Sequence, residues 1–286
     1  MIYLNGDWMP IEKAMVPVLD RGFIFGDGIY EFIPVYGRKP FRAERHFARL
    51  MRSLAAIGIS NPNTEAGWND LLGQIIARQS FEQQGVYFQV TRGVAARDHA
   101  FPKDSKPTVF VMSNPLVTPS AAQFANGMAC VTAVDNRWHR CDIKSISLLG
   151  NVLMRQLAAE HDAIEAVMFR DGFLSEASAS NVFVVKNGVV LAPLKDNLML
   201  HGITLDEVID LTRAAGLPLE LRPIAESEVW TADELWLSSS SKEVVAITKL
   251  DGKPVGAAAH AGKPGPVFAK IRAAYDQAKI DSAKAQ

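Results

Sequence analysis

Cysteine is scarce in this sequence, since Cys130 and Cys141 are the only two among 286 residues. Two cysteines are too few for a disulfide framework, which predicts a reducing compartment, the cytoplasm. A run of about twenty apolar residues, the length that spans a membrane, is also missing. The first residues, Met1–Asp7, lack the basic and apolar regions of a signal peptide. We therefore expect a cytoplasmic protein without a membrane partner.

A surplus of positive charge is absent too, because 30 lysines and arginines face 31 aspartates and glutamates, giving a net charge of −1. This balance argues against a nucleic acid or an anionic membrane as the main partner. The six histidines include no His-Glu-x-x-His pair and no Cys-x-x-Cys partner, so we expect no metal site. Any anionic ligand must therefore be held by a local group of residues.

The composition that is present is that of a globular protein, with 48% hydrophobic and 21% charged residues. The chain is long enough for two domains with separate cores. The stretch 113–120, rich in proline and small polar residues, is the best candidate for a linker. We place a smaller N-terminal domain at residues 1–118 and a larger C-terminal domain, which contains Lys144, at residues 119–286.

Turn and helix signals alternate along both predicted domains. Asn5-Gly6, Asp171-Gly172 and Asn187-Gly188 stand between apolar runs and predict β-hairpins. Apolar residues at helical spacing predict helices at residues 43–57 and 64–83. Strands joined sometimes by turns and sometimes by helices indicate the α+β class, with two mixed α/β domains.

The glycine-rich stretch Asp20–Glu31 does not match a nucleotide-binding loop. A dinucleotide fingerprint needs glycine where Glu31 stands, and the Gly-Lys-Ser/Thr of a P-loop does not follow. We interpret the stretch as a turn that leads into a strand. In the helix predicted at 43–57, Arg49 falls off the apolar face.

Lys144 is the only lysine between Lys106 and Lys186, and the segment Trp138–Ser145 surrounds it with aromatic, thiol and apolar side chains. Partial desolvation of an ammonium favours the free amine, the nucleophile that forms Schiff bases with carbonyl groups. A solvated lysine between a strand and a helix is the alternative that residue type alone favours.

Three further groups of residues carry chemistry. Thr204 and Glu207 form a capping box, which predicts a helix N-terminus with free amides suited to a phosphate. Glu176 stands among small residues and can approach a flat ligand edge-on. Arg97 and His99, two apart in an extended segment, project to the same side and can hold a carboxylate. Each group also has an interpretation without a ligand. Thr204 and Glu207 can cap a helix that binds nothing, Glu176 can be a solvated glutamate, and Arg97 and His99 can belong to a charged surface loop.

Taken together and in order, these segments resemble the class IV (fold-type IV) aminotransferases, which depend on pyridoxal 5′-phosphate. Within that family, the chain is most similar to the D-amino-acid aminotransferases. The matching segments span most of the chain, and they are Arg21–Glu31, Tyr87–Gly93, Arg97–His99, Arg137–Ser145, Glu176–Phe183 and Gly202–Thr204.

The resemblance implies two mixed α/β domains of the fold-type IV kind and a homodimer with active sites at its interface. Lys144 would be the catalytic residue that forms a Schiff base with the cofactor, and Glu176 would pair with the pyridine nitrogen. The other cofactor-binding residues that it implies are Arg49, Leu200, Ile203, Thr204, Ser239 and Ser240. The implied substrate-binding residues are Tyr30, Arg97 and His99, the last two reaching in from the partner subunit.

The implied reaction is transamination between a D-amino acid, such as D-alanine, and a 2-oxo acid, such as 2-oxoglutarate. The Arg97 and His99 pair favours this reaction over those of branched-chain L-amino-acid and (R)-amine aminotransferases of the same fold. Those aminotransferases stay open as an alternative. Two others are an aminodeoxychorismate lyase, which uses the same lysine for elimination, and a catalytically silent member that binds only the cofactor or a protein partner. The chain departs from the D-amino-acid pattern at Asp98, which adds a negative charge, and at Ser240 and Ser241, where threonine is familiar.

Overall fold

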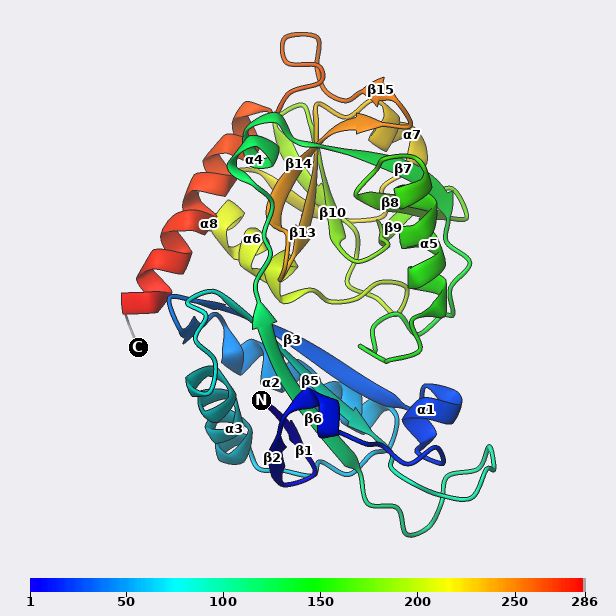
Figure 1. Ribbon diagram of the computed structural model, residues 1–286. Coiled ribbons are helices and arrows are strands. Elements are labelled where there is room, and N and C mark those ends of the chain that lie inside the picture. The colour runs from blue at the N-terminus through cyan, green and yellow to red at the C-terminus, as the bar shows by residue number, and fades with distance from the viewer. Residues whose placement is uncertain (285–286) are drawn as a thin grey trace. The chain divides into compact units, whose positions relative to one another are not determined.

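A computed structural model describes residues 1–284 and divides the chain into two compact units (Figure 1). The first unit comprises Met1–Leu116 and Ile143–Leu148, with residues 282–284. The second comprises Val117–Asp142 and Leu149–Asp281. Both units combine helices with a sheet, so the predicted α+β class is confirmed. Among the described residues, no helix is both long enough and apolar enough to pass through a bilayer.

The sheet of the first unit is antiparallel and has the strand order β2-β1-β6-β5-β3-β4. Its strands are β1 (Ile2–Leu4), β2 (Asp7–Met9), β3 (Gly28–Tyr36), β4 (Lys39–Pro40), β5 (Gln84–Thr91) and β6 (Thr108–Pro115). The predicted hairpin at Asn5-Gly6 joins β1 to β2. Asn5 has φ 52° and Gly6 has φ 111°, the positive values that a tight hairpin turn requires.

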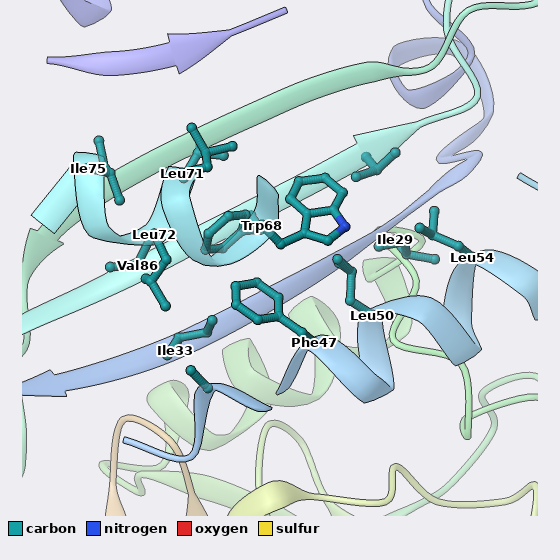
Figure 2. Close-up of a cluster of buried hydrophobic side chains, with 14 of the residues drawn as sticks. Ile29, Ile33, Phe47, Leu50, Leu54, Trp68, Leu71, Leu72, Ile75 and Val86 are labelled. Atoms are coloured by element: carbon teal, nitrogen blue, oxygen red, sulfur yellow. The ribbon is translucent and has the colours of Figure 1, made fainter. Parts of the chain in front are cut away.

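The helices of the first unit are η1 (Ile11–Lys13), α1 (Arg21–Phe25), α2 (Ala43–Ala56) and α3 (Glu65–Ala77). Of these, only α2 and α3 pack buried apolar side chains against this sheet. Figure 2 shows Phe47 of α2 and Trp68 of α3 facing one another, with 6.5 Å between their ring centroids. Ile29 and Ile33 of β3 complete the same core and are fully buried. Burial of such side chains is the main favourable term in folding.

The helix predicted at 64–83 ends earlier, at Ala77. Arg38, in the turn after β3, donates from Nη2 to the carbonyl oxygen of Ile76 at 3.0 Å and from Nη1 to that of Gln79 at 2.8 Å. The last carbonyl groups of a helix have no intrahelical donors, so this guanidinium satisfies the chain where α3 stops. A partner distant in sequence therefore sets the helix end.

The segment Ile143–Leu148 belongs to the first unit, although we expected Lys144 in the C-terminal domain. The backbone N–H of Tyr30 donates to the carbonyl oxygen of Lys144 at 2.9 Å, and that of Ile146 donates to Gly28 at 3.1 Å. The segment is thus paired with the start of β3. This pairing joins residues more than a hundred positions apart, which the local sequence pattern does not specify.

The sheet of the second unit has the order β12-β11-β10-β13-β14-β7-β8-β9, with β15 paired to β14. Its strands are β7 (Met128–Val134), β8 (Glu165–Arg170), β9 (Phe173–Ala177), β10 (Asn181–Lys186), β11 (Val189–Ala192), β12 (Leu219–Leu221), β13 (Glu234–Ser239), β14 (Glu243–Leu250) and β15 (Lys253–Pro254). The hairpins predicted at Asp171-Gly172 and Asn187-Gly188 join β8 to β9 and β10 to β11. Asp171 and Asn187 have φ 52° and 49°.

Helices pack against this sheet. The helices are α4 (Ala121–Asn126), α5 (Leu149–Glu160), α6 (Ile203–Ala214), α7 (Glu226–Trp230) and α8 (Pro266–Lys284). In Figure 1, α5 lies beside β7 and β8, and α6 lies beside β13. Asn181 begins β10 and lies opposite Ser238 of β13 in the strand register. Glu176 lies on β9, just before the turn into β10.

Candidate active site

Lys144 is held in the first unit by both its backbone and its side chain. Its carbonyl oxygen accepts the hydrogen bond from Tyr30 already described, and its Nζ lies 4.1 Å from the centroid of the Tyr30 ring. The face of an aromatic ring attracts a cation, so this contact orients the end of the half-buried side chain. The pairing and the ring together hold the amine beside β3.

Glycine at position 28 is what allows the lysine segment to approach β3. A Cβ there would lie 2.6 Å from the carbonyl oxygen of Val90 and 3.0 Å from Cδ1 of Ile146. Both contacts are shorter than real Cβ atoms tolerate without displacement of their neighbours. The glycine-rich stretch therefore serves close packing of the chain, in keeping with its interpretation as a turn before a strand.

Arg49 is buried, which corrects the prediction that it falls off the apolar face of its helix. Its Nε donates to Glu31 Oε1 at 2.6 Å and its Nη2 donates to Oε2 at 2.9 Å. His46 Nδ1 lies 2.8 Å from the same Oε2. Glu31 is fully buried on β3, and a two-point ion pair with a guanidinium is the geometry that best supports such a carboxylate. The charge of Glu31 explains why Arg49 points inward.

This buried group has a defined charge state. Burial alone would raise the pKa of Glu31, but the charge of Arg49 and its hydrogen bonds hold that pKa well below its usual range. Burial lowers the pKa of His46, and the positive charges of Arg49 and Lys144 lower it further, against the opposing effect of Glu31. Glu31 is thus ionised, and His46 favours its neutral form near the amine of Lys144.

The predicted carboxylate-binding pair, Arg97 and His99, lies exposed on the loop between β5 and β6. Both side chains meet the Phe25 ring, since Arg97 Cζ lies 5.3 Å and the His99 ring 5.4 Å from its centroid. They therefore project to a common side, as their spacing predicted. Tyr30, the third substrate residue of the prediction, stacks on Tyr87 with 5.6 Å between ring centroids.

A buried arginine fastens this loop to the rest of the first unit. Arg21 Nη1 donates to the carbonyl oxygen of Asp98 at 2.5 Å and to that of Ala100 at 3.4 Å, and Nη2 donates to that of His99 at 3.4 Å. Its Nε donates to Asp27 Oδ2 at 2.8 Å. The loop that carries Arg97 and His99 is thus held through its backbone.

In the second unit, Glu176 is buried and surrounded by donors. Its Oε1 accepts from Arg137 Nη1 at 2.7 Å, and its Oε2 accepts from Asn181 Nδ2 and from the backbone N–H of Leu200, each at 3.1 Å. Burial raises the pKa of Glu176 to about 7, although the charge of Arg137 opposes that rise. The hydrogen bonds from Arg137 and Leu200 favour the ionised form of Glu176, which can accept from a ring N–H.

The helix α6 begins at Ile203 with Gly202 as its N-cap, and no side chain caps it. The predicted capping box of Thr204 and Glu207 is therefore wrong, because Thr204 already lies inside the first turn. Glycine at 202 follows from packing, since a Cβ there would lie 2.1 Å from Asn181 Oδ1. The first amides of a helix have no intrahelical acceptors, and the helix dipole is positive there. This N-terminus keeps donors suited to an anion.

Hydroxyl groups follow at the end of β13. Ser238 Oγ is buried and has no hydrogen-bond partner among the described residues. Ser239 Oγ accepts from the backbone N–H of Lys242 at 3.1 Å, which closes the turn into β14. Asn181 lies opposite Ser238 and against Gly202. It therefore connects the end of β13 with the start of α6.

The groups of the second unit fit the cofactor that the sequence resemblance implied. Uncapped amides and an unpartnered hydroxyl are donors for a phosphate, and Glu176 is an acceptor for a pyridine N–H. Leu200 is fixed through its backbone by Glu176 and Asn181. In residues 1–284 there is no group of three or more His, Cys, Asp or Glu side chains able to hold a metal ion.

Sequence reasoning missed Arg137, Asn181 and Glu31 as members of these groups. For Glu31 a signal exists, because the alternation of β3 places it on the same face as Ile29 and Ile33. A charged residue on an apolar face needs a buried partner. Arg137 and Asn181 lack such a signal, since Glu176, the partner that they share, lies in another element, β9.

Comparison with known proteins extends this picture. The family model described as "Amino-transferase class IV" matches residues 28–250. A D-alanine aminotransferase of Bacillus licheniformis is 37% identical over 273 residues, covering 96% of this chain and 95% of that protein. A D-alanine aminotransferase of Staphylococcus aureus is 35% identical and covers 96% of each chain.

Solved structures agree on the fold. A fold IV-transaminase of Curtobacterium pusillum has a TM-score of 0.77 at 27% identity, covering 93% of this chain and 91% of that chain. The branched-chain amino acid aminotransferase of Escherichia coli has a TM-score of 0.87 at 23% identity, covering 96% and 93%. The family match includes the segment Trp138–Ser145, Glu176 and residues 239–242, so the chain belongs to the class IV aminotransferases.

Proposed function

We propose that this chain is a pyridoxal 5′-phosphate-dependent transaminase that moves an amino group between a D-amino acid, such as D-alanine, and a 2-oxo acid, such as 2-oxoglutarate. The observation that carries the proposal is the placement of Lys144, whose backbone is paired with β3 and whose amine lies against the Tyr30 ring. The similarity to D-alanine aminotransferases over nearly the whole chain supports the choice of substrate.

When bound, pyridoxal 5′-phosphate supplies an aldehyde and an electron-accepting pyridinium ring. In the proposal, the amine of Lys144 would hold the cofactor at its aldehyde, and the same amine would take up and return a proton at the substrate Cα. The Tyr30 ring orients that amine. A free amine is needed for the first task and an ammonium for returning the proton, so the side chain must exchange protons while held in place.

Glu176 would hold the proton on the cofactor nitrogen. Arg137 and Asn181 fix both carboxylate oxygens, so the acid cannot rotate away from a flat ligand. The other cofactor-binding residues are proposed from the resemblance, and they are Arg49, Leu200, Ile203, Thr204, Ser239 and Ser240. The amides of Ile203 and Thr204 would bind the phosphate at the start of α6.

Tyr30, Arg97 and His99 would bind the substrate carboxylate. Arg97 and His99 are exposed in the single chain, which suits the proposal that they serve the active site of a partner subunit in a homodimer. An arginine and a histidine provide charge-assisted hydrogen bonds to a carboxylate. We also propose a cytoplasmic enzyme, since Cys130 and Cys141 are both free.

Spectral titration of the holoenzyme tests the function. D-alanine should convert the yellow cofactor to its pyridoxamine form, and L-leucine should not. Conversion by L-leucine but not by D-alanine would favour a branched-chain aminotransferase. Release of pyruvate from aminodeoxychorismate without an amino acceptor would favour a lyase. Retained activity in Lys144→Ala, or a wild type that never binds the cofactor, would reject the proposal that this chain is a transaminase acting through Lys144.

A further inference from the structure

Glu165, the first residue of β8, is a fully buried carboxylate outside the residues discussed so far. Its Oε2 accepts from Ser178 Oγ at 2.5 Å and from the backbone N–H of Ala179 at 2.7 Å. Its Oε1 accepts from Ser180 Oγ at 2.7 Å and pairs with Lys242 Nζ at 2.7 Å. A carboxylate offers about four acceptor positions, so this one is saturated.

The donors come from two segments that border the proposed cofactor residues. Ser178, Ala179 and Ser180 form the turn between β9 and β10, directly after Glu176 and directly before Asn181. Lys242 ends the turn between β13 and β14. All of these residues belong to the second unit. Glu165 therefore anchors two turns. One lies beside Glu176, the proposed partner of the pyridine nitrogen, and the other carries Ser240 and follows Ser239, the proposed phosphate-binding serines.

Lys242 fixes the second turn through both its backbone and its side chain. The Lys242 backbone N–H donates to Ser239 Oγ at 3.1 Å, while its Nζ reaches Glu165. The first turn is fixed likewise, because the Ala177 N–H donates to the Ser180 carbonyl at 2.7 Å while the Ser180 hydroxyl reaches Glu165. Loss of the carboxylate would remove three hydrogen bonds from the first turn and the ion pair from the second.

We propose that Glu165 is a positioning residue for the cofactor. Glu165 sets the distance between Glu176 and the serine turn, residues 239–242, and does not touch the cofactor itself. The inference rests on the proposed function, since it assigns those two segments to the ring nitrogen and the phosphate of one ligand. Four charge-assisted hydrogen bonds to one buried carboxylate give the anchor its rigidity.

The sign of the effect separates positioning from simple electrostatics. Glu165→Gln removes a negative charge near a proposed anion site, and a purely electrostatic effect would tighten phosphate binding. A positioning role predicts weaker binding, because an amide NH₂ cannot accept from the donors that now face one of the carboxylate oxygens. Lys242→Met should also weaken binding under either view, so Glu165→Gln is the decisive variant.

A matched control is available in the same unit. Glu234 is also buried and accepts from the backbone N–H of Val267 at 2.9 Å and of Phe268 at 2.7 Å, at the start of α8. Glu234→Gln is therefore the same substitution at a buried carboxylate that anchors a different segment. It should lower the thermal midpoint of the apoenzyme without changing cofactor affinity.

The experiment titrates the apoenzymes with pyridoxal 5′-phosphate and with pyridoxal, following tryptophan fluorescence. Glu165→Gln should weaken pyridoxal 5′-phosphate binding about tenfold or more, and pyridoxal binding less. Glu234→Gln should leave both affinities within about twofold. If Glu165→Gln does not fold, Ser180→Ala removes one partner of Glu165 without changing any charge, and it should weaken pyridoxal 5′-phosphate binding relative to the control.

The outcomes distinguish this inference from the proposed function. Unchanged or tighter binding by Glu165→Gln, or by Ser180→Ala where Glu165→Gln does not fold, overturns the positioning role and leaves the function standing. Equal weakening by Glu165→Gln and Glu234→Gln overturns it too, because a general loss of stability then explains the effect. A wild-type apoenzyme that binds no pyridoxal 5′-phosphate defeats the proposed function and this inference together.

Discussion

The Nη1 atom of Arg137 lies 2.7 Å from Oε1 of Glu176, and the same guanidinium is fixed from behind by Asp135. Arg137 Nε and Nη2 donate to the two carboxylate oxygens of Asp135, each at 2.9 Å. Ser175 donates to Asp135 as well, at 2.8 Å. Arg137 therefore cannot turn away from Glu176, and its positive charge acts on that carboxylate at a constant distance.

Arg137→Met should move the acid limb of the pH profile upward. The pKa of Glu176 is already raised to about 7 by burial, and loss of the opposing positive charge raises it further. A smaller fraction of Glu176 is then ionised at neutral pH. We expect the limb to move by about one pH unit or more in the half-reaction with D-alanine, measured by stopped-flow absorbance.

Arg140→Met is the control for that measurement. Arg140 is exposed and pairs with Asp142 at 3.0 Å, so its removal changes the local charge equally without touching Glu176. An acid limb that moves alike in both variants would show that Arg137 does not act through Glu176.

Glu31→Gln should destabilise the protein by about 3–5 kcal/mol, because it leaves the buried guanidinium of Arg49 without its anionic partner. Urea unfolding of the apoenzyme measures the change. Glu44 is an exposed residue of α2, the helix that carries Arg49. Glu44→Gln should change the free energy of unfolding by no more than about 0.5 kcal/mol. Equal effects of the two substitutions would contradict the prediction.

The same carboxylate predicts a pH dependence of stability. The pKa of Glu31 is held far below its ordinary value of 4.5, so its contribution to stability is complete above about pH 4.5. That contribution is lost as the pH falls below this value toward the folded-state pKa. The stability difference between wild type and Glu31→Gln should therefore shrink on acidification, and a difference that stays constant would be inconsistent with an ionised Glu31.

Arg21→Lys should weaken the use of substrates that carry a carboxylate. Lysine cannot reach the carbonyl oxygens of the loop and Asp27 at once, so Arg97 and His99 lose their fixed position. We expect KM for D-alanine to rise about tenfold with a smaller change in kcat. The rate with an amine that lacks a carboxylate should not change.

Arg38→Lys controls for the loss of a guanidinium bound to backbone carbonyls. Arg38 donates to Ile76 and Gln79 at the end of α3 in the same unit, far along the chain from the loop. A rise in KM for D-alanine in Arg38→Lys equal to that in Arg21→Lys would show a general loss of stability in place of a displaced loop.

Gly202→Ala should weaken cofactor binding although the backbone of Gly202, at φ −65°, accepts any residue. The new Cβ would meet Asn181 Oδ1 at 2.1 Å and displace it from Glu176 and Leu200. We expect pyridoxal 5′-phosphate affinity, measured by fluorescence titration, to fall about tenfold or more.

Gly73→Ala is the matched substitution in α3, where a Cβ would meet nothing within 4 Å. It should stabilise the protein by about 0.4–1 kcal/mol and leave cofactor affinity unchanged, since alanine restricts the unfolded chain and favours helix. Unchanged affinity in Gly202→Ala would mean that Asn181 does not set the geometry of the cofactor residues.

Local sequence signals predicted much of the fold. Asn-Gly and Asp-Gly turns marked the hairpins because tight turns need positive φ, and the periodicity of Phe47, Leu50 and Leu54 marked α2 as a buried helix. The end of α3 could not be predicted, because Arg38 satisfies its carbonyl groups from another part of the chain. Local patterns specify which elements form, and distant partners specify where they stop.

The candidate residues divide in a similar way. Lys144 and Glu176 could be named from the sequence because the resemblance matched their segments, and their roles remain proposals. The inward turn of Arg49 could not be foreseen, since it depends on Glu31 from a neighbouring strand. The start of α6 was misplaced because a Thr–Glu spacing favours a capping box, whereas packing of Gly202 against Asn181 decides where the helix begins.

The pairing of Ile143–Leu148 with β3 has a consequence for how the protein is made. While the chain is synthesised from its N-terminus, the Tyr30 N–H and the Gly28 carbonyl lack their partners until residue 146 has emerged. An isolated fragment ending at Leu116 would carry Tyr30, Arg49, Arg97 and His99 but not Lys144. It would also present an open strand edge, the kind of surface that promotes aggregation. The segment that contains Lys144 is thus also the segment that completes this edge.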